Sequence, residues 1–282
     1  MSRIAVIGIV GNSVFLPVDR FHVGGETVEA HSIHFELGGK GFNQAVAAAR
    51  CGAVVSFCAA VGRDLSNQVN AFLTNEGVTP HLIEKDSPSA FAAIVTDTKG
   101  ANRVTVYQGC QLTPGDVLTF EDEIKRADIL LLSNEVTGEV NAEAIKIASK
   151  YGTKCILNPA PARTYPKEIL DQIQLFTPNE HETEGIEDRC NCVVTLGKRG
   201  CLIKQSNTLI PAQSKGSAID TTGAGDTFNG VLCALIAQGA SLEYAARAAN
   251  AVAALGVTRK YAVSSIPTAL EINQILKGTE IN

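Results

Sequence analysis

Short apolar runs that alternate with helix-like segments constrain the fold of this chain more than any other feature. The runs cover residues 4–10, 54–62, 129–133, 154–160, 175–180 and 193–197. The helix-like segments cover residues 42–52, 65–77, 141–152, 225–239 and 241–257. Several of these segments end near glycine, as helix C-termini often do. The alternation predicts an α/β fold in which a mostly parallel sheet is covered by helices on both faces.

Two regions interrupt this alternation and predict a smaller sheet beside the main one. Residues 12–37 mix apolar, aromatic and charged side chains, and residues 88–109 have the pattern of a β-hairpin with its turn at 99–102. The chain has no obvious linker or internal repeat. We therefore expect one domain, 1–282, with an inserted small antiparallel β lid formed by about 12–37 and 88–112.

The composition excludes several classes of function. The net charge is -5, charged residues make up 19% of the chain, and no Lys/Arg-rich block is present, so nucleic acid is not the expected partner. No signal-peptide pattern and no apolar run of membrane-spanning length is visible, so we expect a cytoplasmic protein without a membrane partner. The eight cysteines are expected to be reduced core thiols. The close pair Cys190 and Cys192 has no second ligand pair nearby and does not indicate a zinc site.

The stretch from Asp220 to Asp226 is the most informative motif. Its sequence, DTTGAGD, permits a tight turn directly before a helix. The main-chain N–H groups of residues 223–225 could point at a phosphoryl group there, because a helix N-terminus carries unpaired donors and partial positive charge. Asp226 would then accept the proton of an attacking hydroxyl. The alternative is a glycine-rich turn in which Asp226 only caps the helix.

A second glycine-rich turn, GGKG at residues 38–41, precedes the helix-like segment 42–52. Glycines allow close approach of the backbone to a ligand, and the amide of Asn43 suits sugar hydroxyls. Lys40 could bind phosphate or be solvated. Taken alone, this motif also has a structural explanation.

The two motifs, in this order, resemble the two signature segments of the ribokinase-like carbohydrate kinase family: GGKGFNQAVAAARCG (38–52) and DTTGAGDTFNG (220–230). Further matching segments are GGET (24–27), VGRD (61–64), LNPAPAR (157–163), TPNEHE (177–182), VTLGKRG (194–200) and VTRKYAVSSIP (257–267). The resemblance covers nearly the whole chain. It implies a ribokinase-like three-layer sandwich and ATP-dependent phosphorylation of a primary hydroxyl on a small sugar, with ATP, Mg²⁺ and K⁺.

The resemblance also implies roles for individual residues. Asp226 matches the catalytic base, and the matched anion hole consists of Gly223, Ala224 and Gly225. The matched sugar contacts are Gly38, Gly39, Lys40, Asn43 and Glu135, although Glu135 could also be an ordinary exposed residue at a strand end. The matched ATP-binding positions are Asn179, Thr195, Gly197, Gly200 and Asn250. Glu182 matches a residue that binds Mg²⁺ through water. The matched positions around a monovalent cation are Asp220, Thr222, Gly256, Arg259, Tyr261 and Ser265.

The chain departs from the family pattern in two places. Gly11 and Ser13 stand where family members have an Asn and an Asp that bind sugar hydroxyls, so a strong charge-assisted acceptor is missing. Asn12 is a candidate substitute, and ribose itself is in doubt. The segment between Asn179 and Val193 is also short, which predicts a trimmed nucleotide side.

Two alternatives to a sugar kinase remain open at this point. A nucleoside kinase, acting on pseudouridine or another ribonucleoside, would use the same chemistry under the same lid. A non-catalytic sugar-binding protein is the other alternative, and the intact Asp226, Asn179 and Glu182 argue against it. By analogy with the family we also expect a homodimer that pairs through the lid, because an exposed sheet edge is a template for pairing.

Overall fold

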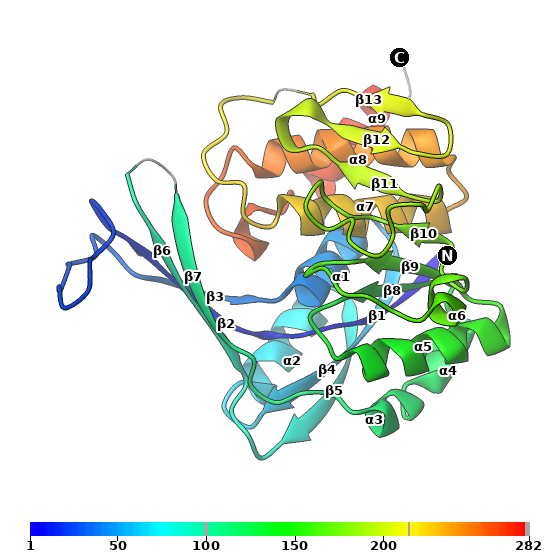
Figure 1. Cartoon of the computed structure of the whole chain (residues 1–282), viewed down its shortest axis with the longest axis horizontal. Coiled ribbons are helices and arrows are strands. Elements are labelled where there is room, and N and C mark those ends of the chain that lie inside the picture. The colour runs from blue at the N-terminus through cyan, green and yellow to red at the C-terminus, as the bar shows by residue number, and fades with distance from the viewer. Residues whose placement is uncertain (99–100, 214, 280–282) are drawn as a thin grey trace.

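A parallel sheet runs through the centre of the protein. The computed structural model describes residues 1–98, 101–213 and 215–279. The sheet has the strand order β10-β9-β8-β1-β4-β5, and every neighbouring pair is parallel. Its strands are β1 (Arg3–Ile7), β4 (Val54–Gly62), β5 (Val78–Lys85), β8 (Ile129–Ser133), β9 (Lys154–Asn158) and β10 (Leu175–Phe176). The expected mostly parallel sheet is thus confirmed (Figure 1).

Helices cover both faces of this sheet, because side chains along each strand alternate between two cores. One core includes Ile4 and Val6, and its helices are α1 (Lys40–Arg50), α2 (Ser66–Asn75), α7 (Ala224–Ala237), α8 (Leu242–Gly256) and α9 (Ala269–Thr279). The other core includes Ala5 and Ile7, and its helices are α3 (Pro114–Leu118), α4 (Glu121–Arg126), α5 (Gly138–Tyr151) and α6 (Lys167–Leu170). The expected three-layer α/β sandwich is therefore confirmed.

A second sheet projects from the side of this body (Figure 1). It has the order β3-β2-β6-β7, with β2 (Gly11–Pro17), β3 (His34–Gly38), β6 (Ala90–Thr96) and β7 (Asn102–Tyr107). The pairs β2–β3 and β6–β7 are antiparallel as expected, whereas the middle pair β2–β6 is parallel. The middle pair joins two separate hairpin-like excursions of the chain, which explains the mixed sheet. Of the predicted hairpin turn, residues 99–100 lie outside the described residues.

The sequence prediction for residues 193–197 was wrong about the sheet. This run forms β11 (Val193–Thr195), which pairs antiparallel with β12 (Cys201–Ile203), and β12 pairs with β13 (Thr208–Ile210). The chain reverses through the 3₁₀ turn Gly197–Arg199, so the run belongs to a separate three-stranded sheet.

Two further strands, β10 and β5, also differ from the expectation. The strand expected over residues 175–180 stops at Phe176, shortly before Pro178, which has no N–H to donate. Strand β5 escaped prediction because Pro80 and His81 interrupt its apolar pattern, although an edge strand tolerates proline.

The cysteines mostly follow the expectation of core thiols. All eight are free, and only Cys190 is exposed. Among the described residues, no helix is both long and apolar enough to span a membrane.

Helices α1 and α7 pack without space between them at Gly230. A Cβ atom built on Gly230 would lie 2.4 Å from the carbonyl oxygen of Gln44 and 2.6 Å from the Cβ of Ala47. Real Cβ atoms do not approach a neighbour this closely, so glycine is required here. This contact holds side by side the two helices that start at the two predicted motifs.

Replacing Gly230 with alanine should therefore destabilise the protein although alanine favours helices. We expect a loss of about 1–3 kcal/mol in the free energy of unfolding, because an extra methyl group overpacks the α1–α7 contact. Denaturant unfolding measures it. The matched control is Gly278→Ala in α9, where a Cβ atom meets nothing within 4 Å. That control should be neutral or stabilising by up to about 1 kcal/mol; equal effects of the two substitutions would contradict the packing argument.

Candidate active site

The two glycine-rich turns form the N-termini of α1 and α7. Gly39 is the N-cap residue of α1 with φ 123°, and a Cβ atom there would lie 2.3 Å from the carbonyl oxygen of Ile9. Gly223 is the N-cap residue of α7 with φ 75° in the left-handed region. Both positions therefore favour glycine for conformational reasons. The first N–H groups of a helix lack partners within the helix, which suits an anionic ligand, although the N–H of Ala224 donates to the carbonyl of Thr221 at 3.2 Å.

Asp226 connects the two helices. One carboxylate oxygen accepts a hydrogen bond from Nδ2 of Asn43 at 2.9 Å, and the other accepts one from Nε2 of Gln44 at 3.2 Å. Both donors come from α1, and no side chain caps α7, whose N-cap is Gly223. The alternative in which Asp226 merely caps its own helix is therefore wrong. The geometry brings the two sequence motifs together around one buried carboxylate.

Three charged groups lie around this carboxylate. Burial raises the pKa of Asp226 above its usual range, against the charge of Lys40 and the two amide hydrogen bonds. Burial also raises the pKa of Glu135 to about 7, and the main-chain N–H of Lys40 donates to Glu135 at 2.6 Å. The charge of Asp226, followed by those of Glu135 and Glu182, raises the pKa of Lys40. Lys40 thus stays protonated beside two carboxyl groups whose affinity for protons is increased.

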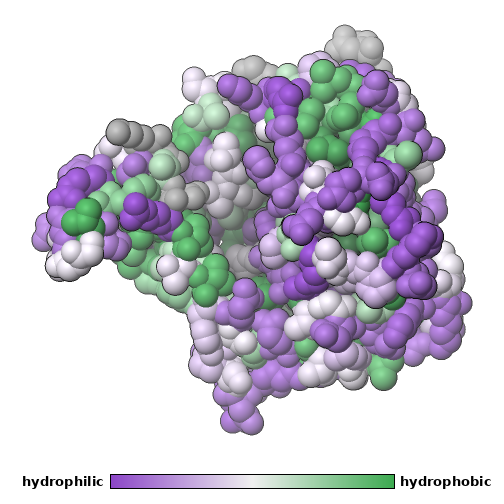
Figure 2. All heavy atoms as spheres, in the orientation of Figure 1, coloured by the Kyte–Doolittle hydropathy of each residue, from purple (hydrophilic) through white to green (hydrophobic). Residues whose placement is uncertain are grey.

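These residues line a cavity of about 280 Å³ between the lid and the body. Asp226, Asn43, Lys40 and Glu135 form its polar floor. Its apolar roof is formed largely by side chains of the lid, namely Phe15, Ala92, Ile94, Val104 and Val106. Figure 2 shows the hollow between the projecting lid and the body, with apolar side chains along the lid. The cavity is therefore polar on the side of the predicted base and apolar on the side of the lid.

The two departures from the family pattern lie in this cavity. Gly11 lines it, and a Cβ atom on Gly11 would lie 2.1 Å from the carbonyl oxygen of Ala90. No side chain fits at this position, because β2 and β6 approach each other here. Ser13 and Asn12 also line the cavity and bring only neutral polar groups. The lid side of the cavity thus lacks the carboxylate that the family pattern has there.

The residues predicted to bind ATP form two small groups. Asn179 and Thr195 form an isolated parallel β-bridge, in which the N–H of Thr195 donates to the carbonyl oxygen of Pro178 at 2.9 Å. Gly200 has φ 99° and packs against the carbonyl of Ile210, which also accepts a hydrogen bond from Nδ2 of Asn250 at 3.3 Å. Gly197 starts the 3₁₀ turn that connects the two groups.

Glu182 is held close to Asn179. One of its carboxylate oxygens accepts the main-chain N–H of Asn179 at 3.0 Å. A carboxylate has further lone pairs, and a hard oxygen donor set of this kind fits a hydrated Mg²⁺. The charge of Glu182 also contributes, after those of Asp226 and Glu135, to the raised pKa of Lys40 in the cavity floor.

The predicted cation positions gather around the turn that precedes α7. Asp220 accepts hydrogen bonds from the N–H and hydroxyl of Thr222 at 2.9 and 2.7 Å and from the N–H of Tyr261 at 2.9 Å. The side chain of Arg259 instead pairs with Glu271, and the hydroxyl of Ser265 donates to the carbonyl of Ala262. Carboxylates and main-chain carbonyls have further lone pairs, so Asp220 and the carbonyls near Gly256 and Tyr261 are the candidate ligands for a cation.

Sequence reasoning missed two polar residues behind the base. Nε2 of Gln44 bridges Asp226 and the side chain of Asn158, and Asn158 donates to the carbonyl of Thr177 at 2.8 Å. Gln44 is 0% exposed. Its signal in the sequence is a glutamine directly before the apolar run of residues 45–49, within the segment expected to be a buried helix. A polar side chain in such a segment must have a buried partner.

Comparisons with known proteins show the family of this chain. The family model described as "pfkB family carbohydrate kinase" matches residues 1–269. The chain is 34% identical to the ribokinase of Bacillus subtilis over 98% of this chain and 100% of the relative.

Two solved structures are similar along nearly their whole length. Ribokinase from Thermotoga maritima has a TM-score of 0.86 at 32% identity and covers 98% of this chain and 100% of its own. The structure of Arabidopsis thaliana ribokinase complexed with ribose and ATP has a TM-score of 0.83 at 26% identity, covering 98% and 99%. The resemblance predicted from the sequence is confirmed, and the chain belongs to the pfkB family of carbohydrate kinases.

Proposed function

We propose that this protein is an ATP-dependent kinase that phosphorylates a primary hydroxyl of a small sugar or sugar-like substrate, a ribose-like pentose or a ketose. The single observation that supports this most is the placement of Asp226. Its buried carboxylate lies in the first turn of α7, directly after residues 223–225 in the chain, and in the floor of the cavity together with Asn43.

Asp226 would act as the general base. The acceptor hydroxyl gives its proton to the carboxylate while its oxygen forms a bond to the γ-phosphorus of ATP, and ADP leaves with the electrons of the broken P–O bond. A base works best when its pKa lies near the operating pH. Burial, which raises the pKa of Asp226, acts in that direction.

The transferring phosphoryl group would be stabilised by positive and dipolar groups on both sides. The N–H groups of Gly223, Ala224 and Gly225 would form an anion hole at the start of α7, where Ala224 would share its N–H with the carbonyl of Thr221, which accepts it at 3.2 Å. Lys40 supplies a fixed positive charge at the start of α1. Mg²⁺, when bound, supplies charge neutralisation on the phosphates, and Glu182 with Asn179 would hold it through water.

The nucleotide would lie along Thr195, Gly197, Gly200 and Asn250, next to the Asn179–Glu182 pair. K⁺ would be held by main-chain carbonyls of the loop around Gly256, Arg259, Tyr261 and Ser265, with Asp220 and Thr222 ordering that loop. A cation there would lie directly beside the turn that forms the anion hole.

Residues of about 12–37 and 88–112 would act as a lid of the single domain 1–282 that closes over the acceptor and excludes water. The lid would also pair two copies into a homodimer. Its strand β7 is at the edge of the sheet and carries the half-exposed Tyr107, which does not line the cavity, and these features favour pairing with another chain.

A ribonucleoside kinase is the second candidate function. The apolar roof and the neutral groups at Gly11 and Ser13 favour it, because a planar base would contact such a roof better than a fully hydroxylated sugar. The floor and the phosphoryl-transfer chemistry would be the same in both cases.

A phosphoacceptor screen separates these functions. We expect ADP release from ATP and Mg²⁺ with at least one member of a panel of D-ribose, 2-deoxy-D-ribose, D-fructose and ribonucleosides, assayed with and without K⁺. Turnover with nucleosides alone would favour the second candidate. Binding of panel members in a thermal-shift assay without any ADP release would leave a non-catalytic sugar-binding protein.

Replacing Asp226 with asparagine should abolish most of the turnover. We expect kcat to fall by about 10²–10⁴-fold because asparagine cannot accept the proton, while binding of ATP persists. The matched control is Asp122→Asn on the exposed part of α4, which should keep the activity of the unmodified chain. Turnover of the Asp226 variant near that of the control would show that another group is the base.

Replacing Glu135 with glutamine should change how stability depends on pH. The native pKa of about 7 lies above the ordinary value of 4.5, so the folded state binds this proton more tightly than the unfolded chain. The stabilisation is complete below about pH 4.5 and is lost as the pH rises through about 7. The Tm of the unmodified chain should therefore fall relative to that of Glu135→Gln between about pH 5 and about pH 8. Parallel Tm curves for the two proteins would contradict the raised pKa.

A further inference from the structure

Glu36 is a buried carboxylate outside the predicted site. It lies on β3 of the lid, just before Gly38, and is 8% exposed. One oxygen accepts the main-chain N–H of Ala262 at 2.7 Å, and the other accepts the N–H and the hydroxyl of Ser264 at 3.2 and 2.7 Å. A buried carboxylate is costly unless such donors surround it. The three hydrogen bonds therefore bind the lid strand firmly to the loop of residues 262–264.

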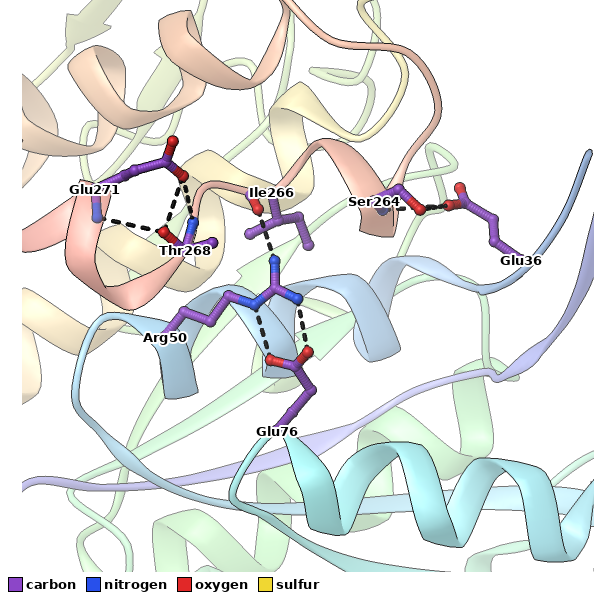
Figure 3. A network of polar contacts seen from close by, with 7 residues as sticks. All are labelled: Glu36, Arg50, Glu76, Ser264, Ile266, Thr268 and Glu271. Carbon is purple, nitrogen blue, oxygen red and sulfur yellow. Dashed lines mark hydrogen bonds and ion pairs between the residues drawn. The ribbon is translucent and has the colours of Figure 1, made fainter.

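The same loop is fastened to α1 at a second point (Figure 3). Arg50, the last residue of α1, donates to the carbonyl of Ile266 at 2.6 Å and pairs with Glu76. Glu36 precedes α1 and Arg50 ends it, so the 262–266 segment is attached at both ends of this helix. The two attachments differ in their relation to the cavity. Ala262, which Glu36 holds, lines the cavity, whereas Ile266, which Arg50 holds, is not one of the lining residues.

Ala262 transmits the Glu36 contact to the predicted anion hole. A Cβ atom on Gly223 would lie 3.1 Å from the Cα of Ala262, so these two residues are packed together. Both line the cavity with Asp226. Any shift of Ala262 toward or away from α7 therefore alters the space around Gly223.

A second carboxylate holds the loop from the opposite side. Asp220 accepts the N–H of Tyr261 and, with its other oxygen, the N–H and hydroxyl of Thr222. Tyr261 has φ 75°, and its ring stacks on His34 of β3 with centroids 3.7 Å apart. The loop between Tyr261 and Ser264 is thus hydrogen-bonded on one side to the turn before α7 and on the other to β3, the strand before α1.

We propose that Glu36 is a positioning residue for phosphoryl transfer. This role rests on the proposed kinase function. Through Ala262 and Ser264 it fixes the distance between the two glycine-lined helix starts, the 38–41 turn and the 222–225 turn. It does not line the cavity itself. A misplacement of about 1 Å between reacting groups can cost on the order of 10²-fold in rate, so a residue that sets this distance acts on kcat.

The kinetic test compares Glu36→Gln with a matched control. Glutamine keeps the shape of the side chain but offers one acceptor oxygen, and its NH₂ group faces an N–H donor of the loop. With ATP, Mg²⁺ and the best acceptor of the screen, we expect kcat to fall by about 10- to 100-fold with little change in the KM for ATP. Ser264→Ala, which removes a single hydrogen bond, should give a smaller fall of the same kind. If Glu36→Gln does not fold, the fall in kcat of Ser264→Ala still tests the proposal.

The control is Glu76→Gln, which weakens the attachment at the other end of α1. It should lower the Tm and leave kcat per folded molecule unchanged. A purely structural role of Glu36 would give the same pattern as this control, and that result would overturn the proposal.

Amide hydrogen exchange tests the same coupling without any substrate. In Glu36→Gln, exchange should rise by about tenfold or more in 262–264 and also at the amides of Ala224 and Thr227, which donate to the carbonyls of Thr221 and Gly223, whereas Glu76→Gln should leave these two amides unchanged. Faster exchange in 262–264 alone would show that the loop is not coupled to the anion hole. If the unmodified chain phosphorylates no acceptor, the kinase proposal fails, and this exchange result still decides whether Glu36 positions the turn.

Discussion

The hydrogen bonds from Asn43 and Gln44 to the carboxylate of Asp226 are the interaction on which the rest of the site depends. They connect a helix start near the beginning of the chain with one near its end, and they do so in a buried place. A carboxylate can be kept there only with donors at both oxygens. The first turns of α1 and α7 must therefore lie side by side, which requires the close packing of these helices.

That packing depends on small residues at a few positions. Gly230 of α7 faces Gln44 and Ala47 of α1, and Gly8 after β1 faces Gly41, where a Cβ atom would be 2.6 Å from the Cα of its neighbour. Larger side chains at these points would push α1 away from the sheet and from α7. The amide groups that hold Asp226 would then lose their geometry, because hydrogen bonds weaken steeply with distance and angle.

Much of the fold and of the site could be predicted from the sequence, and the failures have physical causes. Periodicity located most of the buried strands and the helices α1, α2, α5, α7 and α8, but it missed helix α9. It also missed β5, whose proline and polar residues suit a sheet edge, and it assigned β11 to the wrong sheet. Glycine motifs located the floor of the cavity, because a helix start that faces an anion needs particular residues. The partners of Gln44 and Glu36 could not be predicted, since both depend on segments far apart in the chain that only the fold brings together.

The residues that hold the groups for phosphoryl transfer differ from those that line the acceptor side of the cavity. Asp226, Glu36 and Asp220 each use both carboxylate oxygens on protein donors, so the two helix starts and the loop between them form a rigid unit. The roof is built differently: Ala92, Ile94, Val104 and Val106 line it from β6 and β7 of the projecting sheet, and β2 separates these strands from the β3 strand that carries Glu36. Substitutions in the roof can therefore change which acceptor fits without moving the groups that transfer the phosphoryl group. Gly11 and Ser13 lie on β2, between these roof strands and β3, so the two departures from the family pattern change the polar groups offered to the acceptor while the signature turns are kept.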